Sequence, residues 1–211
     1  MSTQKLIATL AADRSREMNP ARMLAAATLA GAAVTALVFF LRVGARPDFM
    51  IAMHSWRFIG KFVLTLTLAA SAAFLVLRAA RPGAARGRMD GMLFAAPALL
   101  MVAVIAELML VPQAGWMPRM IGHNAFVCST LIPILSLGPL VLLLYALRRG
   151  AVTAPARAGA LAGLVAGGLG AAFYAAHCPD DSPFFVAVWY TLAITFVSAV
   201  GASLGKRLLS W

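Results

Sequence analysis

Residues 126–147 read FVCSTLIPILSLGPLVLLLYAL, twenty-two positions without a charged side chain. An α-helix needs about 20 apolar residues to cross the roughly 30 Å hydrocarbon core of a bilayer, so this stretch is long enough to span one. Five similar runs lie on either side of it. Together the six runs cover approximately residues 23–41, 62–77, 91–111, 126–147, 158–176 and 184–204. The sequence therefore predicts an all-α integral membrane protein whose six-transmembrane-helix bundle occupies residues 23–205.

The overall composition supports a membrane protein. Of the 211 residues, 62% are hydrophobic and 12% are charged, whereas a soluble domain keeps about a quarter of its residues charged. This excludes a soluble enzyme and a disordered chain. The run that begins at Met23 follows some twenty polar and charged residues, so we interpret it as a retained span rather than a secretory signal. Residues 1–22 and 206–211 are predicted to be tails outside the membrane.

The distribution of Lys and Arg predicts the orientation. The chain holds 18 Lys and Arg against 7 Asp and Glu, a formal charge of +11. Thirteen of the 18 fall in the two tails and in the second and fourth loops, and five fall on the other side. Basic residues favour the cytoplasmic side of a membrane, so both termini are expected in the cytoplasm. The same distribution accounts for the net charge, and we expect no direct binding of nucleic acid.

Small residues recur at helical spacing in the last two runs. Gly159, Gly163 and Gly167 are four residues apart, and Gly201 and Gly205 repeat the spacing. Stripes of small residues let membrane helices approach closely. With a short loop between them, the fifth and sixth helices are expected to form a tight antiparallel hairpin.

The predicted topology gathers the reactive side chains on the outer side. These are His54, His123, His177, Cys128 and Cys178, joined by Asp48, Asp180 and Asp181. Glu107 is the one carboxylate inside a predicted span, near the outer end of the third helix. An acid at that depth is either a functional group or a structural acid, here paired with Arg119, and both interpretations stay open.

The two cysteines allow three interpretations. Cys128 lies one turn into the fourth helix and Cys178 follows the fifth, so both belong near the same membrane surface. They would form a structural disulfide in an oxidising compartment, or act as a reversible thiol switch. Thiolates with His177 would also suit a thiophilic metal. No CxxC or HxxxH pair is present, so we assign no metal and no cofactor.

The N-terminal tail has a possible partner surface. Leu6, Ile7 and Leu10 would share one face of a short helix, which would lie on the lipid bilayer or dock a soluble partner. No phosphate-binding loop, no nucleophile with a paired base and no carboxylate dyad occurs in the chain. We therefore expect no enzymatic activity.

Several stretches resemble one protein family. The segment His177-Cys-Pro-Asp-Asp-Ser-Pro-Phe-Phe-Val-Ala-Val-Trp-Tyr190 is similar to the signature of the NrsF family. So are Ala151, Pro155 and Gly159 at the start of the glycine-rich helix, Cys128, the Arg81-Pro82-Gly83 turn, and the closing segment 205–211. The resemblance covers essentially the whole chain and is most specific from Arg148 to Trp211.

The resemblance implies a function. NrsF proteins are six-span anti-sigma factors of bacteria, negative regulators of extracytoplasmic-function (ECF) sigma factors resembling sigma F. By this resemblance the chain would hold such a sigma factor at the cytoplasmic face of the inner membrane and release it under oxidative or thiophilic-metal stress. Cys128 and Cys178 would be the sensing pair. Auxiliary candidates at the outer face are His177, Asp180, Asp181, His123 and Glu107, and the partner surface would include Leu6, Ile7 and Leu10.

Two other classes remain as alternatives. One is a small transporter and the other a thiol-redox membrane protein with a structural outer disulfide. The sequence also leaves open whether the chain forms a homo-oligomer.

Overall fold

Six long apolar helices make up most of the part of the chain that the structure describes. The computed structural model describes residues 3–5, 7–8, 19–80, 88–150 and 152–210, and these residues contain no strand. The stretches long and apolar enough to cross a membrane are Pro20–Arg42, Trp56–Ala79, Met89–Leu110, Ala125–Arg148, Pro155–Ala175 and Pro183–Leu208. The prediction of an all-helical chain with six such helices is confirmed.

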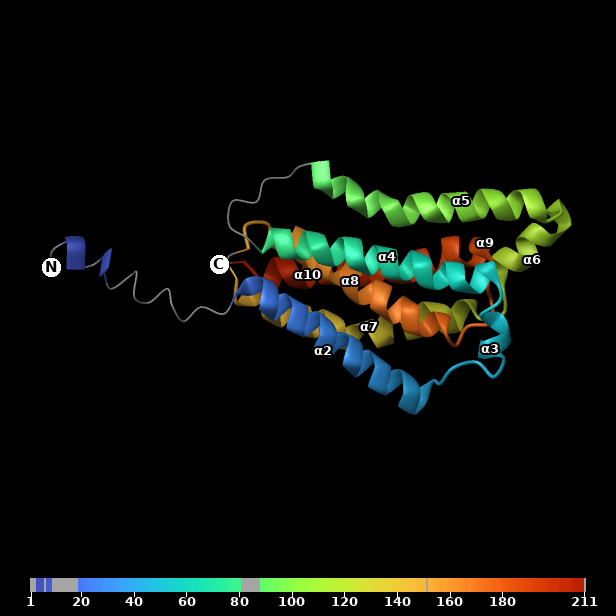
Figure 1. The fold of residues 1–211 in the computed structure, drawn as a ribbon, viewed down its shortest axis with the longest axis horizontal. Helices are drawn as coiled ribbons and strands as arrows, with labels where there is room; N and C mark the ends of the chain where they lie inside the picture. Colours follow the sequence, from blue (N-terminus) through green and yellow to red (C-terminus); the bar gives the residue numbers. More distant parts are fainter. Residues whose placement is uncertain (1–2, 6, 9–18, 81–87, 151, 211) are drawn as a thin grey trace.

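The elements follow a simple order along the chain (Figure 1). The long helices are α2 (Pro20–Arg42), α4 (Trp56–Ala79), α5 (Ala95–Leu110), α7 (Ala125–Arg148), α8 (Pro155–Ala175) and α10 (Thr191–Leu208). Short elements precede or join them: α3 (Phe49–Ala52), η2 (Arg88–Phe94), η3 (Gln113–Gly115), α6 (Trp116–Ile121), α9 (Pro183–Phe185) and the π-helical turn η4 (Val186–Tyr190).

Helix α4 begins six residues before the apolar run that predicted it. The additional turns carry Arg57 and Lys61, which the sequence alone assigns to an outer loop. Arg57 pairs with Glu107 and Lys61 with Asp181. Hydropathy alone would place Arg57 and Lys61 outside a membrane-spanning helix. Their carboxylate partners neutralise both cations and so allow the helix to include them.

Helix α8 lies at the centre of the bundle, where it packs on α4, α7 and α10 (Figure 1). Of the 18 residues that form its most apolar stretch, 78% are buried, against 11% for the corresponding stretch that contains α5. Glycines on three faces of α8 allow the neighbouring helices to pack closely against it. A Cβ added to Gly168 would lie 3.0 Å from the Thr65 carbonyl oxygen of α4. A Cβ added to Gly170 would lie 2.9 Å from the Ile132 carbonyl oxygen of α7.

The contact between α8 and α10 is made by backbone atoms. A Cβ on Gly159 would lie 2.8 Å from Gly205 Cα, and one on Gly163 would lie 2.6 Å from Ser198 Cα. The Ser198 hydroxyl donates a hydrogen bond to the Ala160 carbonyl at 3.1 Å. The predicted tight antiparallel hairpin is therefore present, and glycine is required along its seam.

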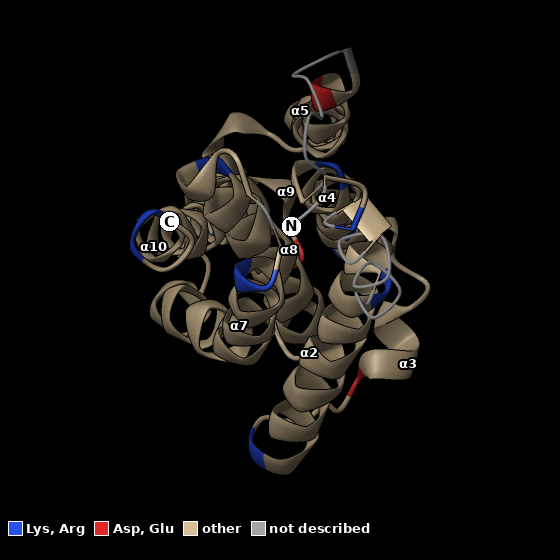
Figure 2. Ribbon diagram, turned by 90° about the vertical axis from the view of Figure 1, so that its left-hand side faces the viewer, with Lys and Arg blue, Asp and Glu red and all other residues tan. Residues whose placement is uncertain are grey.

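The two ends of the bundle differ in chemistry. Helix α2 begins and α10 ends at the same end, which faces the viewer in Figure 2. The helix termini there carry Arg22, Arg78, Arg148, Arg157, Lys206 and Arg207. The opposite end carries the loops that contain the histidines and Cys178, together with the first turn of α7 that contains Cys128. The candidate functional site lies at that opposite end.

Candidate functional site

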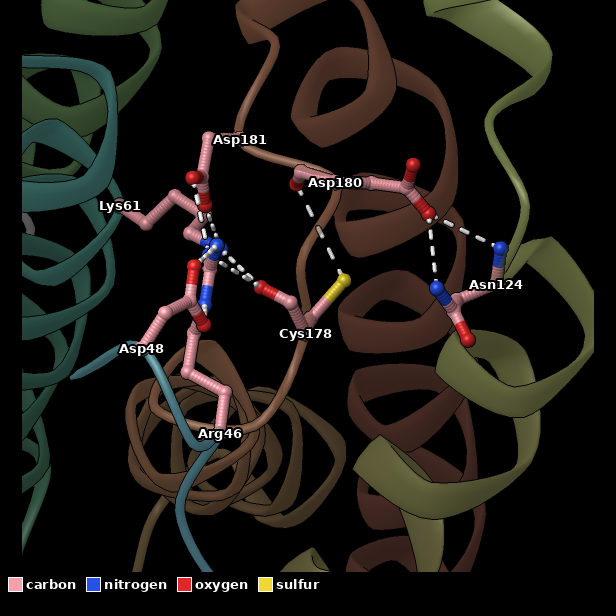
Figure 3. Close-up of polar contacts among 7 residues, drawn as sticks. All are labelled: Arg46, Asp48, Lys61, Asn124, Cys178, Asp180 and Asp181. Atoms are coloured by element: carbon pink, nitrogen blue, oxygen red, sulfur yellow. Dashed lines mark hydrogen bonds and ion pairs between the residues drawn. The ribbon is translucent and has the colours of Figure 1, made fainter. Parts of the chain in front are cut away.

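Cys178 is the centre of the site. It lies three residues beyond the end of α8, and its backbone N–H donates to the Tyr174 carbonyl at 3.0 Å. Its own carbonyl accepts from Lys61 Nζ at 2.8 Å and from Arg46 Nη1 at 3.4 Å. Figure 3 shows these two cations converging on one side of Cys178, while Asp180 extends to the other side. The Cys178 backbone is thereby held by α4 and by the loop after α2.

An ion-pair network surrounds this carbonyl. Arg46 makes two 2.6 Å contacts with the carboxylate of Asp48 and one of 2.9 Å with Asp181. Lys61, only 1% exposed, lies 2.6 Å from the other Asp181 oxygen. Hydrogen bonds from Arg46 hold the pKa of Asp48 below its ordinary value, and the same contacts raise the pKa of Arg46. Arg46 and Asp48 are thus charged at neutral pH, and the network joins the α2–α3 loop, α4 and the segment that precedes α9.

Asp180 holds the start of α7, the helix that carries Cys128. Its carboxylate accepts from the backbone N–H of His123 at 3.1 Å and of Asn124 at 2.9 Å, and from the Asn124 side chain at 3.1 Å. A carboxylate at a helix N-terminus satisfies free N–H groups and complements the helix dipole. The segment around Cys178 therefore also anchors α7.

Both cysteines are free thiols and both are fully buried. Cys128 and Cys178 belong to the same apolar cluster, which includes Phe39, Tyr174 and Tyr190. Burial raises the pKa of the Cys178 thiol, since an apolar surrounding disfavours the thiolate. In this state Cys178 is a neutral thiol at physiological pH and a weak nucleophile.

We expect both thiols to resist a bulky alkylating reagent in the folded protein. A maleimide should leave the mass of the detergent-solubilised chain unchanged near neutral pH and add two labels after denaturation in SDS. The reason is that both side chains are fully buried, and burial also lowers the thiolate fraction of Cys178 by raising its pKa. Intact-mass spectrometry measures the labelling. Rapid addition of maleimide to the folded chain would contradict the buried arrangement.

Glu107 forms a second charged cluster at the same end. Its side chain is 0% exposed and accepts from Arg57 Nε at 2.8 Å and from Arg119 Nη1 at 2.8 Å. Ser182 Oγ lies 3.4 Å from the same carboxylate. The pairing with Arg119 agrees with the structural interpretation of this acid, and Arg57 is an additional partner. The cluster connects α4, α5 and α6 to the segment that precedes α9.

The remaining sequence candidates are dispersed. The His123 side chain is 95% exposed, and the His177 ring lies against Tyr174 with Nδ1 3.0 Å from the Gly44 carbonyl. Within the described parts of the chain no group of three or more His, Cys, Asp or Glu side chains could hold a metal ion. Ile7 is exposed, and Leu6 and Leu10 lie outside the described residues.

Sequence reasoning missed the cations of the site. The sequence places Arg46 and Lys61 in an outer loop and gives them no partner, whereas the structure shows that they hold the carbonyl of Cys178 and the carboxylate of Asp181. A signal was available, because Lys61 directly precedes an apolar run and Asp180 and Asp181 follow another at the same predicted surface. Opposite charges at one membrane surface would be expected to pair.

Comparisons with known proteins point to one family. The family model described as "Negative regulator of sigma F" (NrsF) matches residues 10–211. The chain is 36% identical over 218 residues to the "Anti-sigma-F factor NrsF" of Caulobacter vibrioides (strain NA1000 / CB15N), and 34% identical over 216 residues to the "Probable anti-sigma-F factor NrsF" of Azospira oryzae (strain ATCC BAA-33 / DSM 13638 / PS). Each alignment covers the whole of both chains. No solved structure matches.

Proposed function

Since this chain belongs to the NrsF family, we propose that it is a membrane-embedded anti-sigma factor that sequesters an ECF-type sigma factor at the cytoplasmic face of the inner membrane. The family match over residues 10–211 carries the proposal. The asymmetric distribution of Lys and Arg supports an orientation with both termini in the cytoplasm. The end that carries Cys178 would then face the periplasm.

In this proposal Cys128 and Cys178 are the sensing residues. In the oxidative form of the trigger, each thiol gives up one proton and one electron as an S–S bond forms, and a small oxidant takes up the two electrons. A thiophilic cation would instead displace the two protons and bind both sulfurs. Full burial of the thiols favours a small agent in either case. His177, Asp180, Asp181, His123 and Glu107 would support the site.

The contacts around Cys178 supply a physical route for the signal. A new bond at its sulfur would displace a backbone carbonyl that Lys61 and Arg46 hold, and would disturb Asp180 at the start of α7. Helix α8 leads directly from Cys178 to the segment before Pro155 at the other end of the bundle. Its glycines leave no space for independent movement against α4, α7 or α10, so a displacement of α8 would be shared by its neighbours.

The switch needs only a modest coupling free energy. The two thiol states must favour different helix arrangements, and the sigma factor must bind one arrangement better. A coupling of about 1–3 kcal/mol would change partner affinity about 5- to 150-fold. We assign the sigma-binding surface to the N-terminal tail, including Leu6, Ile7 and Leu10, and to the loops at the same end.

The proposal is tested by affinity purification from detergent-solubilised native membranes with partner identification by mass spectrometry. A small sigma factor should co-purify before treatment with an oxidant or a thiophilic cation and be lost after it. Cys128→Ser and Cys178→Ser should retain the partner through the same treatment, because neither variant can complete the pair. Ser129→Ala, one residue from Cys128, is the matched control and should behave as the unmodified chain.

The anti-sigma assignment and the sensing role of the cysteines can be contradicted independently. Absence of any sigma factor in both conditions, with the chain itself recovered from the membrane, would overturn the anti-sigma assignment. Normal release in both cysteine variants would overturn the sensing role and leave the anti-sigma assignment intact.

A further inference from the structure

An apolar cavity of about 600 Å³ separates α5 from the rest of the bundle. Its size falls within the roughly 300–1,000 Å³ of known ligand pockets. The walls include Leu64 and Leu68 of α4, Leu100 of α5, Leu164 of α8 and Ile194 of α10. In Figure 1, α5 is the helix that stands to one side of the other five. The cavity is thus bounded by helices long and apolar enough to cross a membrane, and in a bilayer such a space would be surrounded by lipid.

One opposite-charge pair lines this mainly apolar space, which also has the hydroxyl side chains of Thr65, Tyr190, Thr191 and Thr195 in its walls. Arg157 Nη2 donates to Asp90 Oδ1 at 2.7 Å, and the two side chains are 31% and 38% exposed. Arg157 stands in the first turn of α8 and Asp90 in η2, at the end of the bundle where α2 begins and α10 ends. The pair therefore lies at the membrane surface, where lipid headgroups are found.

From this pair the cavity runs into the membrane. Leu164 lies seven residues beyond Arg157 on α8, about 10 Å along the helix at 1.5 Å per residue. The lining continues to Val186 and Tyr190 of η4. An elongated apolar space with charge at its surface end matches the shape of a lipid, a polar head joined to a long apolar chain.

We propose that a phospholipid with a zwitterionic ammonium–phosphate headgroup, such as phosphatidylethanolamine, inserts one acyl chain into this cavity. Its phosphate binds Arg157, whose planar guanidinium suits phosphate oxygens. Its ammonium binds Asp90 as a charge-assisted hydrogen bond. Both side chains are partly exposed, and a partly exposed ion pair is worth little by itself, so adding the headgroup costs little.

The charge pair selects this headgroup over other amphiphiles. A lipid with a net negative headgroup, such as phosphatidylglycerol, would satisfy Arg157 but would offer no cation to Asp90. A cationic amphiphile would have the opposite conflict with Arg157. Only a headgroup that presents both signs complements Asp90 and Arg157 together.

Native mass spectrometry of the full chain, stripped of lipid in detergent, tests the proposal. On titration with phosphatidylethanolamine and phosphatidylglycerol of the same acyl composition, one phosphatidylethanolamine should bind with about tenfold higher affinity, a difference of about 1.4 kcal/mol. Leu68→Trp, which fills the cavity, should lower that affinity about tenfold, again about 1.4 kcal/mol. Leu66→Trp is the matched control on the same helix, at a 49% exposed position outside the lining, and should bind as the unmodified chain.

A second variant tests the headgroup. Asp90→Asn combined with Arg157→Gln should remove the preference between the two lipids while leaving the acyl chain bound. Equal retention of phosphatidylethanolamine by Leu68→Trp and Leu66→Trp, with both variants folded by circular dichroism, would overturn the cavity assignment. Equal affinity of the unmodified chain for both lipids would overturn the headgroup assignment. If Leu68→Trp does not fold, the Asp90 and Arg157 variant and the two-lipid comparison decide the proposal.

Discussion

Replacing Gly159 with valine should separate α8 from α10 and lower the free energy of unfolding by about 3 kcal/mol, the upper end of the usual range for overpacked positions. A Cβ at this position would lie 2.8 Å from Gly205 Cα and 3.0 Å from the backbone carbonyl carbon of Gly201, besides a closer contact with the Gly201 oxygen. Backbone atoms of a neighbouring helix cannot rotate away as a side chain can. The helices must move apart, and the Ser198–Ala160 hydrogen bond would be lost.

The measurement is the unfolding transition of the purified chain in detergent, followed by circular dichroism. Gly60→Val is the matched control, because a Cβ at Gly60 has nothing within 4 Å. This control should change stability by no more than about 0.5 kcal/mol, as surface substitutions usually do. Equal stability of the two variants would contradict the close contact between α8 and α10.

Removing both cations around Glu107 should be at least as damaging. In the double variant Arg57→Gln/Arg119→Gln, a carboxylate with 0% exposure loses both ionic partners. Leaving one buried charge without its partner costs about 3–5 kcal/mol. Each single substitution leaves one cation in place, so we expect the two single variants to be clearly more stable than the double variant.

The control for this prediction is a rescue. Adding Glu107→Gln to the double variant removes the uncompensated charge, and most of the lost stability should return when the three proteins are unfolded under identical conditions. If the triple variant were no more stable than the double variant, the loss would come from the arginine side chains themselves and not from the charge of Glu107.

The sequence was sufficient for the number of helices and for one helix pair. Runs such as residues 126–147 need only length and hydropathy, which are local properties. The spacing of Gly159, Gly163, Gly201 and Gly205 predicted which two helices meet at their backbones, because small residues at this spacing have one main structural use in membranes. The position of α5 at the side of the bundle had no comparable local signal.

The candidate site could be predicted only in part for a related reason. Cys128 and Cys178 are rare residues, so they stand out in a list of residue types. Arg46 and Lys61 act through partners more than 100 residues away in the sequence, and a single sequence does not indicate which charges will meet. Lys61 also appears unfavourable for a helix inside a membrane until Asp181 is placed beside it.

The composition of α8 has a consequence for how the chain is made. Among the six apolar stretches it has the lowest mean hydropathy, 1.5 against 1.9 to 2.4 for the others, because its glycines and alanines supply contact surface for protein instead of lipid. During translation this helix emerges before α10, the partner that covers its glycine seam. A nonsense mutation that removes α10 would leave that seam facing lipid, and quality-control proteases should degrade the product. Helix α10 thus completes a core that the five long helices before it cannot close.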